Sequence, residues 1–226
     1  MKIILLPSIT TTKGADPLAQ IAEAKSLGIS QIGLFLTALG TEERYELYSR
    51  LLEAGIKTPF VHLRNDMDEK ELDLLVYKLG AKICNLHPLA ERPREYKNFS
   101  KYKGIIYLEN SFTLPQKEEM KGWAGLCLDY AHLEDARLRG DKNYEGTKDL
   151  FPQYPIGIGH ISAIKKVPHP DEGGLPEQRY DSHRMTSLSD VDYLKKYKKF
   201  FCRIMVMELV NCFEDQLKAI KYIRSF

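Results

Sequence analysis

Residues 104–132 read GIIYLENSFTLPQKEEMKGWAGLCLDYAH, a stretch with two short apolar runs that each stop at ionisable side chains. Short apolar runs rich in β-forming residues are typical of buried parallel strands. The first run ends at Glu109, and the second ends at Asp129, with His132 three residues later. Because side chains alternate along a strand, both carboxylates are expected to project from the ends of neighbouring strands toward a common space. In parallel α/β proteins, functional sites are built at those strand ends.

Similar apolar runs recur along the chain, and helical patterns fill most of the gaps between them. The eight runs lie at residues 2–8, 29–36, 57–63, 81–87, 104–110, 125–131, 156–162 and 203–210. Helices are predicted at residues 16–28, 41–55, 68–80, 89–99, 115–125, 133–140, 189–200 and 213–226. The clearest of them place apolar side chains at helical spacing and end on a glycine, which is a usual stop residue.

This alternation of strand and helix predicts right-handed βαβ units, and eight such units close naturally into a (β/α)8 TIM barrel. We therefore expect residues 1–226 to form a single α/β domain with a metal site at the C-terminal ends of the strands. An open doubly wound sheet is the competing architecture, but no G-x-G-x-x-G motif follows the first strand. Residues 165–187 are rich in proline and glycine and are predicted to form a long loop above the site.

The composition narrows the classes of partner and compartment. There are 33 basic and 31 acidic residues and no long run of either sign, so nothing indicates a polyanion partner and nucleic acid is the less favoured ligand. The four cysteines contain no C-x-x-C pair and are predicted to be small core residues in a reducing compartment. Pro7 interrupts the first apolar run below signal-peptide length, and no run is long enough to cross a membrane. We expect a cytoplasmic protein without a membrane partner, and the sequence indicates no particular oligomeric state.

The ionisable side chains at predicted strand ends form a larger set. Its members are His62, His87, Glu109, Asp129, His132, His160 and Glu208, joined by Asp181 and His183 in a D-x-H motif of the long loop. A single histidine at a strand end is more often a hydrogen-bonded structural residue than a ligand, whereas a buried carboxylate needs a cation or a donor. Together, four carboxylates and five imidazoles at one rim would repel one another or stay unsatisfied without a positive centre. A divalent metal supplies that centre, and these ligand types suit zinc, manganese, cobalt or iron.

Three basic side chains are predicted to lie near the same rim. Arg64, Arg184 and Lys165 follow strand ends or belong to the long loop, so they could hold a phosphate group. Solvated surface charge is the default interpretation for each of them.

With these residues assembled, the chain resembles the xylose-isomerase-like (AP endonuclease family 2) barrel superfamily, which contains sugar isomerases and epimerases together with the endonuclease IV group. The metal centre shared in that superfamily corresponds here to Glu109 in YLEN, Asp129 in LDYAH, His160 in GHIS and Glu208 in MELVN. LDYAH is the most specific match, since it combines the aspartate with His132. The endonuclease IV group and many short proteins classed as sugar-phosphate isomerases have further positions, matched by His62, His87, His132, Asp181 and His183, so all nine positions of the trinuclear pattern are present.

The resemblance implies a divalent metal cofactor of one to three ions and leaves three functions open. The first is an isomerase or epimerase of a small sugar or sugar phosphate, acting through a metal-stabilised enediolate, with Glu109 and Glu208 as acid/base groups and His132 as an orienting group. The second is an endonuclease IV-like phosphodiester hydrolase acting at abasic sites with a di- or trinuclear metal site. Nine ligands favour it, whereas the short loops and near-neutral charge count against it. The third is a barrel that binds a metal or a sugar without turnover.

Overall fold

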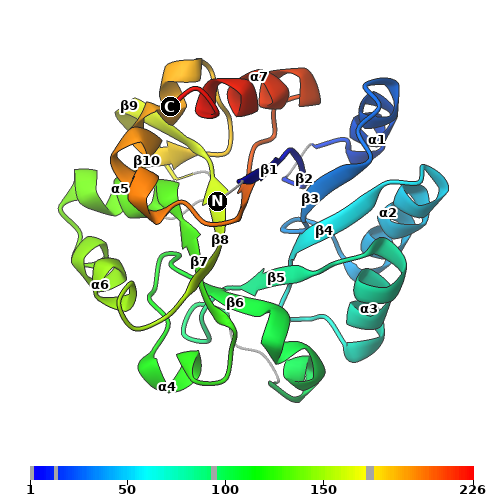
Figure 1. The fold of residues 1–226 in the computed structure, drawn as a ribbon, viewed down its shortest axis with the longest axis horizontal. Helices are drawn as coiled ribbons and strands as arrows, with labels where there is room; N and C mark the ends of the chain where they lie inside the picture. Colours follow the sequence, from blue (N-terminus) through cyan, green and yellow to red (C-terminus); the bar gives the residue numbers. More distant parts are fainter. Residues whose placement is uncertain (1–2, 13–14, 93–95, 172–175) are drawn as a thin grey trace.

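The computed structural model describes residues 3–12, 15–92, 96–171 and 176–226. Within these ranges, nine parallel strands form one sheet in the order β1-β11-β8-β7-β6-β5-β4-β3-β2. β1 (Ile4–Leu6) and β2 (Ser8–Thr10) are two halves of one strand, because β1 pairs with β11 while β2 pairs with β3. Between the halves, the Pro7 carbonyl still accepts a hydrogen bond from the Gly33 N–H, at 2.8 Å. This shared strand brings the two edges of the sheet together, so the sheet forms a nearly closed eight-position barrel (Figure 1).

The other strands fall inside the predicted apolar runs. They are β3 (Gln31–Phe35), β4 (Lys57–His62), β5 (Ile83–Leu86), β6 (Ile106–Glu109), β7 (Gly125–Asp129), β8 (Ile156–Ile161) and β11 (Ile204–Met207). Their registers place Glu109 beside Cys127, two residues before the end of β7, and Asp129 beside His160. The predicted TIM barrel is therefore confirmed, and its carboxylates share one rim.

Helices surround the barrel (Figure 1). They are α1 (Pro17–Ser26), α2 (Thr41–Glu53), α3 (Glu69–Leu74) with a π-helical continuation (Leu75–Leu79), α4 (Lys117–Met120), α5 (Tyr130–Arg139), α6 (Asn143–Leu150) and α7 (Phe213–Ile223), with 3-10 helices at Tyr96–Ile105 and Leu188–Phe200. The helix predicted at 89–99 is wrong for residues 89–92, which form turns and a bend, while residues 93–95 lie outside the described ranges. A helix across that segment would hold Pro93 in its interior, where the ring clashes with the preceding turn.

The segment 165–187 differs from the predicted loop. β9 (Ala163–Pro170) and β10 (Gln178–Ser182) form an antiparallel hairpin, and residues 172–175 between them are outside the described ranges. The hairpin is tied to α5 by Asp135, which accepts from Arg179 Nη1 at 2.9 Å and from the Tyr180 N–H at 2.8 Å. These contacts join residues more than forty positions apart, so local turn chemistry did not indicate them.

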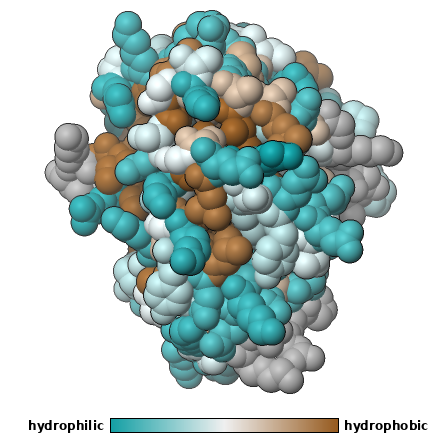
Figure 2. Space-filling view, turned by 90° about the vertical axis from the view of Figure 1, so that its right-hand side faces the viewer, coloured by the Kyte–Doolittle hydropathy of each residue, from teal (hydrophilic) through white to brown (hydrophobic). Residues whose placement is uncertain are grey.

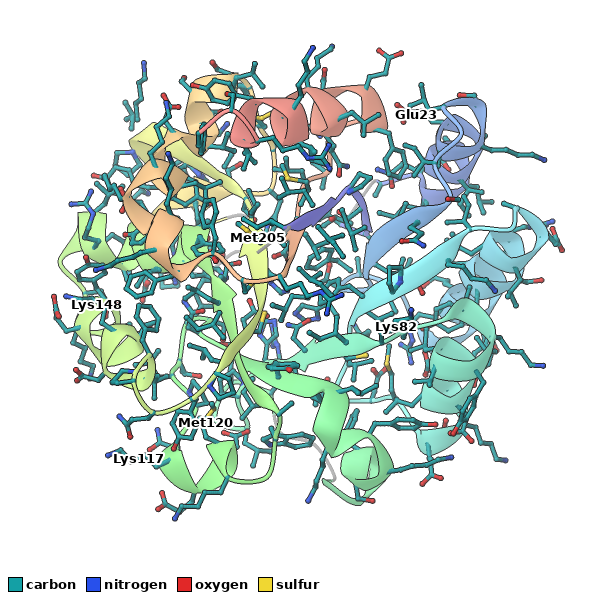
Figure 3. All side chains as sticks on the ribbon, viewed as in Figure 1. Glu23, Lys82, Lys117, Met120, Lys148 and Met205 are labelled. Carbon is teal, nitrogen blue, oxygen red and sulfur yellow. The ribbon has the colours of Figure 1, made fainter. Side chains whose placement is uncertain are left out.

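The barrel interior below the strand ends is filled by side chains, as the stick view shows (Figure 3). This inner cluster consists of Leu6, Phe35, Phe60, Ile83, Cys127, Ile158 and Val206. The rings of Phe35 and Phe60 pack edge-on against His160, at centroid distances of 5.0 and 5.3 Å. Polar side chains therefore begin directly above an apolar floor. The outer face seen in Figure 2 is largely hydrophilic with an apolar band, and no helix among the described residues is long and apolar enough to cross a bilayer.

Candidate metal centre

The ends of β6, β7 and β8 and the residue after β11 bring four predicted ligands together. Glu109, Asp129, His160 and Glu208 are all buried, and one ligand atom from each lies within 4.8 Å of the others. His160 Nδ1 lies 3.6 Å from Glu109 Oε1, 3.8 Å from Asp129 Oδ2 and 3.4 Å from Glu208 Oε2. One imidazole nitrogen thus faces three carboxylates. That these side chains bind a metal stays a prediction.

The surroundings of His160 show that a cation fits this group. Its Nδ1 atom is buried and has no hydrogen-bond partner among the described residues, while its Nε2 atom lies 3.3 Å from Cys127 Sγ. A buried nitrogen without a partner is unfavourable, and three buried carboxylates at one point repel one another. A divalent ion among them would satisfy both requirements at once. Carboxylates combined with an imidazole suit manganese, iron, cobalt or zinc.

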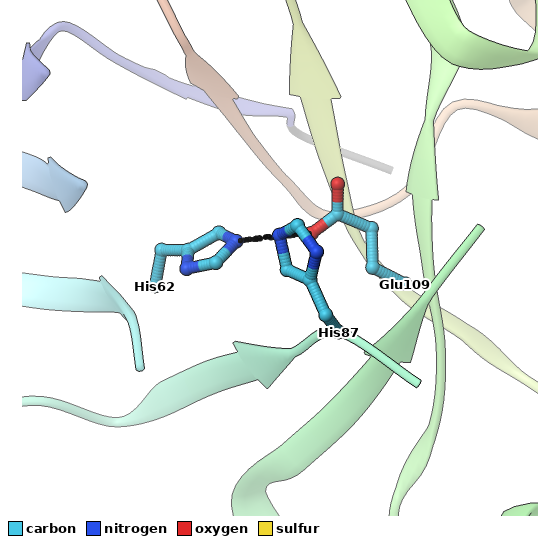
Figure 4. A group of neighbouring side chains, drawn as sticks. All are labelled: His62, His87 and Glu109. Atoms are coloured by element: carbon cyan, nitrogen blue, oxygen red, sulfur yellow. Dashed lines mark hydrogen bonds and ion pairs between the residues drawn. The ribbon is translucent and has the colours of Figure 1, made fainter. Parts of the chain in front are cut away.

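A second group shares Glu109 with the first. His62 is the last residue of β4 and His87 follows β5, and both have ligand atoms within 4.8 Å of a Glu109 oxygen. His62 Nε2 lies 3.2 Å from Glu109 Oε2 and 2.9 Å from His87 Nε2 (Figure 4). Glu109 therefore turns Oε2 toward the two histidines and Oε1 toward His160. A carboxylate placed this way can bridge two ions.

The remaining three predicted ligands, His132, Asp181 and His183, lie at the edge of this site, each close to another predicted ligand. His132 Nδ1 is 3.1 Å from Asp181 Oδ2, and His132 Nε2 is 4.0 Å from Glu109 Oε1. His183 Nε2 is 3.4 Å from Glu208 Oε1. Within the described parts of the chain, His132, Asp181 and His183 belong to no group of three or more ligand atoms that all lie within 4.8 Å of one another. All nine predicted residues thus meet at one rim, but the third ion has no compact set of ligands.

Comparison with known proteins supports the architecture. No family model matches the sequence, and no curated protein matches it. A xylose isomerase domain containing protein from Salmonella typhimurium is 15% identical, with a TM-score of 0.51 over 100% of this chain and 98% of that one. A xylose isomerase-like TIM barrel protein from Mycobacterium smegmatis, solved in complex with magnesium, is 13% identical, with a TM-score of 0.52 over 94% of this chain and 90% of that one. The chain has the fold of the xylose-isomerase-like TIM barrels.

The chain is also similar to an N-acetylneuraminate lyase from Mycoplasma synoviae. The two are 13% identical, with a TM-score of 0.53 over 98% of this chain and 73% of that one. Enzymes with different reactions therefore share the architecture. The likeness establishes the fold alone, and the chemistry has to be argued from the site.

Charges within the barrel's site are strongly coupled. Burial, together with the charges of Glu208 and Glu109, raises the pKa of Asp129 to about 6 against the opposing effect of His132. Burial opposes protonation of His132, but the charge of Asp129 and the contact with Asp181 prevail and raise its pKa to about 10. The pKa of Glu109 is held well below its usual value despite burial, chiefly by His160. Without a metal, protonated imidazoles therefore provide the positive charge that balances the carboxylates.

Two supporting residues were missed by the sequence reasoning. Glu91 accepts hydrogen bonds from His87 Nδ1 and Ser111 Oγ, which turns the other ring nitrogen of His87 toward His62. Asn85 donates from Nδ2 to Glu109 Oε2 at 2.5 Å. The only local signals were the four-residue spacing of His87 and Glu91 and a polar residue inside an apolar run, and both patterns are common in surface segments.

Proposed function

We propose that the protein is a metal-dependent isomerase or epimerase of a small sugar or sugar phosphate. The observation that carries this proposal is the buried group of Glu109, Asp129, His160 and Glu208 at the C-terminal ends of the barrel strands. A divalent ion held by these residues would stabilise negative charge that develops on substrate oxygens. The fold shared with structures described as xylose isomerase-like supports the same class of enzyme.

Glu109 and Glu208 are the proposed acid/base pair. Moving a proton between adjacent carbons requires one group that removes it and one that returns it. The two carboxylates approach the same nitrogen of His160, at 3.6 and 3.4 Å, from different strands. The pKa of each lies below its usual value because nearby imidazoles outweigh burial, so both are ionised at neutral pH. His132, whose raised pKa keeps it charged, is placed to orient a substrate oxygen.

A phosphodiester hydrolase of the endonuclease IV kind is the second candidate. The group of His62, His87 and Glu109 favours it, because hydrolysis with two ions needs positive charge on both the attacking and the leaving oxygen. The net charge of +2 counts against a duplex DNA substrate, since such proteins neutralise several phosphates with basic side chains. An assay of the reaction distinguishes the third function, binding without turnover, from the isomerase and the hydrolase.

The deciding experiment follows proton exchange. Protein loaded with manganese or zinc is incubated in deuterated water with a panel of ketoses and ketose phosphates, and deuterium incorporation is measured by mass spectrometry. We expect metal-dependent exchange that falls about 10²–10⁴-fold in Glu109→Gln and Glu208→Gln, the usual contribution of a positioned acid or base. Glu53→Gln is the matched control, because Glu53 is an exposed residue of α2 far from the rim.

Other outcomes would select another function. Incision of duplex DNA at abasic sites that depends on His87 and stops with chelator would reject the isomerase and promote the hydrolase. Bound metal without exchange or incision would favour the non-catalytic barrel.

A further inference from the structure

The mouth of the site beside the second metal-ligand group is lined by arginines. A pocket of about 440 Å³ is formed by His62 and His87 together with Thr37, Arg64, Asn65 and Arg92, among other residues. A neighbouring pocket shares Thr37 and Arg92 and adds Arg184. The two hollows therefore belong to one opening, and its positive side chains lie next to the predicted metal ligands.

Arg64 is held firmly in this opening. Its Nε donates to Asp66 Oδ1 at 3.1 Å, and its Nη1 donates to the carbonyls of Leu36 and Thr37, at 3.4 and 2.5 Å. Nη2 makes no hydrogen bond to any described residue. Nε and Nη1 are thus held by the protein, and the two N–H donors of Nη2 are available to a molecule in the pocket.

A buried series of charges lies behind Arg64. Arg44 is fully buried and pairs with Glu71 at 2.6 Å and with Asp66 Oδ2 at 3.2 Å. Asp66 therefore accepts from Arg44 on one oxygen and from Arg64 on the other. Burying an arginine costs desolvation that an ion pair rarely exceeds, so stability alone does not account for this arrangement. Its structural effect is to fix Asp66 and, through Asp66, the orientation of Arg64.

Acidic side chains near the opening are already paired. Glu91 is bound to His87 and Ser111, Asp181 lies 3.1 Å from His132, and Asp171 lies 3.6 Å from Arg179. Lys165, which the sequence placed among the possible phosphate-binding residues, is instead 2.9 Å from Asp190. Arg64 shares Asp66 with Arg44, and Arg92 and Arg184 add further positive charge at the mouth.

We infer that Arg64 and Arg92 form an anion subsite that binds the phosphate of a phosphate monoester, beside the metal centre. A guanidinium holds its N–H donors in a fixed plane, which an ammonium does not, and both N–H groups of Arg64 Nη2 can donate to phosphate oxygens. Since the pocket is also lined by His62 and His87, a phosphate held there leaves the rest of the molecule next to Glu109. The inference rests on the proposed function and narrows its substrate class to sugar phosphates.

The test is a binding measurement without metal or turnover. Inorganic phosphate is titrated into chelator-treated protein at low ionic strength and followed by calorimetry. We expect one saturable site, with phosphate displaced by glycerol phosphate but not by glycerol. Arg64→Gln should weaken phosphate about tenfold to a hundredfold, the effect of losing a charge-assisted hydrogen bond. Arg50→Gln, which removes the same charge from the exposed surface of α2, should leave the affinity unchanged.

A second pair of variants guards against misfolding. Arg92→Gln should also weaken phosphate binding, and Arg64→Lys, which keeps the charge but not the paired donors, should fall between wild type and Arg64→Gln. Each variant is checked by its unfolding transition. No saturable binding, or the same affinity in wild type, Arg64→Gln and Arg92→Gln, would overturn the subsite.

The two proposals fail in different ways. Phosphate binding that depends on Arg64, in a protein that exchanges no substrate proton, keeps the subsite and rejects the isomerase. Proton exchange with a ketose phosphate, at a kcat/KM unaffected by Arg64→Gln, keeps the isomerase and rejects the subsite.

Discussion

Replacing Asp129 with asparagine separates metal binding from the structural role of this residue. Asp129 Oδ1 accepts from the His132 N–H at 2.7 Å and so caps α5, while Oδ2 lies 3.8 Å from His160 Nδ1 among the predicted ligands. Asparagine retains an oxygen for the cap but has no charge with which to bind a cation. The substitution therefore removes the ligand and preserves the helix.

The expected effect follows from the linkage between binding and folding. An ion present at about 100 times its dissociation constant adds about 2.7 kcal/mol to the free energy of unfolding. In a domain of roughly 150–250 residues, each kcal/mol shifts the melting temperature by about 2–4 °C. Wild-type protein should therefore melt about 5–11 °C higher with metal than with chelator, and Asp129→Asn should lose most of that difference.

Without metal, the same substitution should have the opposite effect and raise the stability of the protein. Burial and the charges of Glu208 and Glu109 raise the pKa of Asp129 to about 6, above the value of about 4 in an unfolded chain. An acid whose pKa is higher in the folded state costs stability when it ionises, so the cost begins above about pH 4 and is complete above about pH 6. At pH 7.5, metal-free Asp129→Asn should therefore melt above metal-free wild type, and the gap should shrink as the pH falls toward 5.

Scanning calorimetry with chelator and with zinc or manganese measures both effects. Asp129→Ala serves as a second variant, since it loses the ligand and the cap together. Its free energy of unfolding should be about 1 kcal/mol lower than that of Asp129→Asn. Equal metal-dependent shifts in wild type and Asp129→Asn, or no shift in wild type with any divalent ion, would refute the assignment of Asp129 as a ligand.

Two further predictions concern the second ligand group and the buried ion pair. His87→Ala should lower the metal content by one ion per chain and leave the ion near His160, because only the group with His62 and Glu109 loses a ligand. Anomalous scattering at a metal edge counts the ions. A single peak remote from His87 in the wild-type protein would contradict a second ion at this group. Arg44→Met should lower the free energy of unfolding in urea by about 3–5 kcal/mol, because Glu71, 2% exposed, is left charged without its partner. Arg50→Met on the same helix should change it by less than about 0.5 kcal/mol, and an equal loss in both variants would reject the reasoning.

The local sequence pattern was sufficient to predict the barrel strands, because each strand corresponds to a short run of apolar residues. β6 and β7 are apolar segments that end at a carboxylate, and any parallel sheet carries such ends to one rim. The histidines at the ends of neighbouring strands could be assigned to the same rim for this reason. α6 was missed because its eight residues, NYEGTKDL, contain few apolar positions and a glycine, and only Thr147 and Leu150 are buried.

The sequence by itself determined the order of strands and helices and the residue types that stand at the strand ends, since both are properties of contiguous residues. Tertiary structure decided which oxygen of Glu109 faces which histidine, and it decided that 163–182 pairs as a hairpin on Asp135. It alone linked Arg44 through Asp66 to Arg64. Those features depend on distances between residues far apart in the chain, and hydrogen bonds and charge interactions act over a few ångströms in space, whatever the separation in sequence.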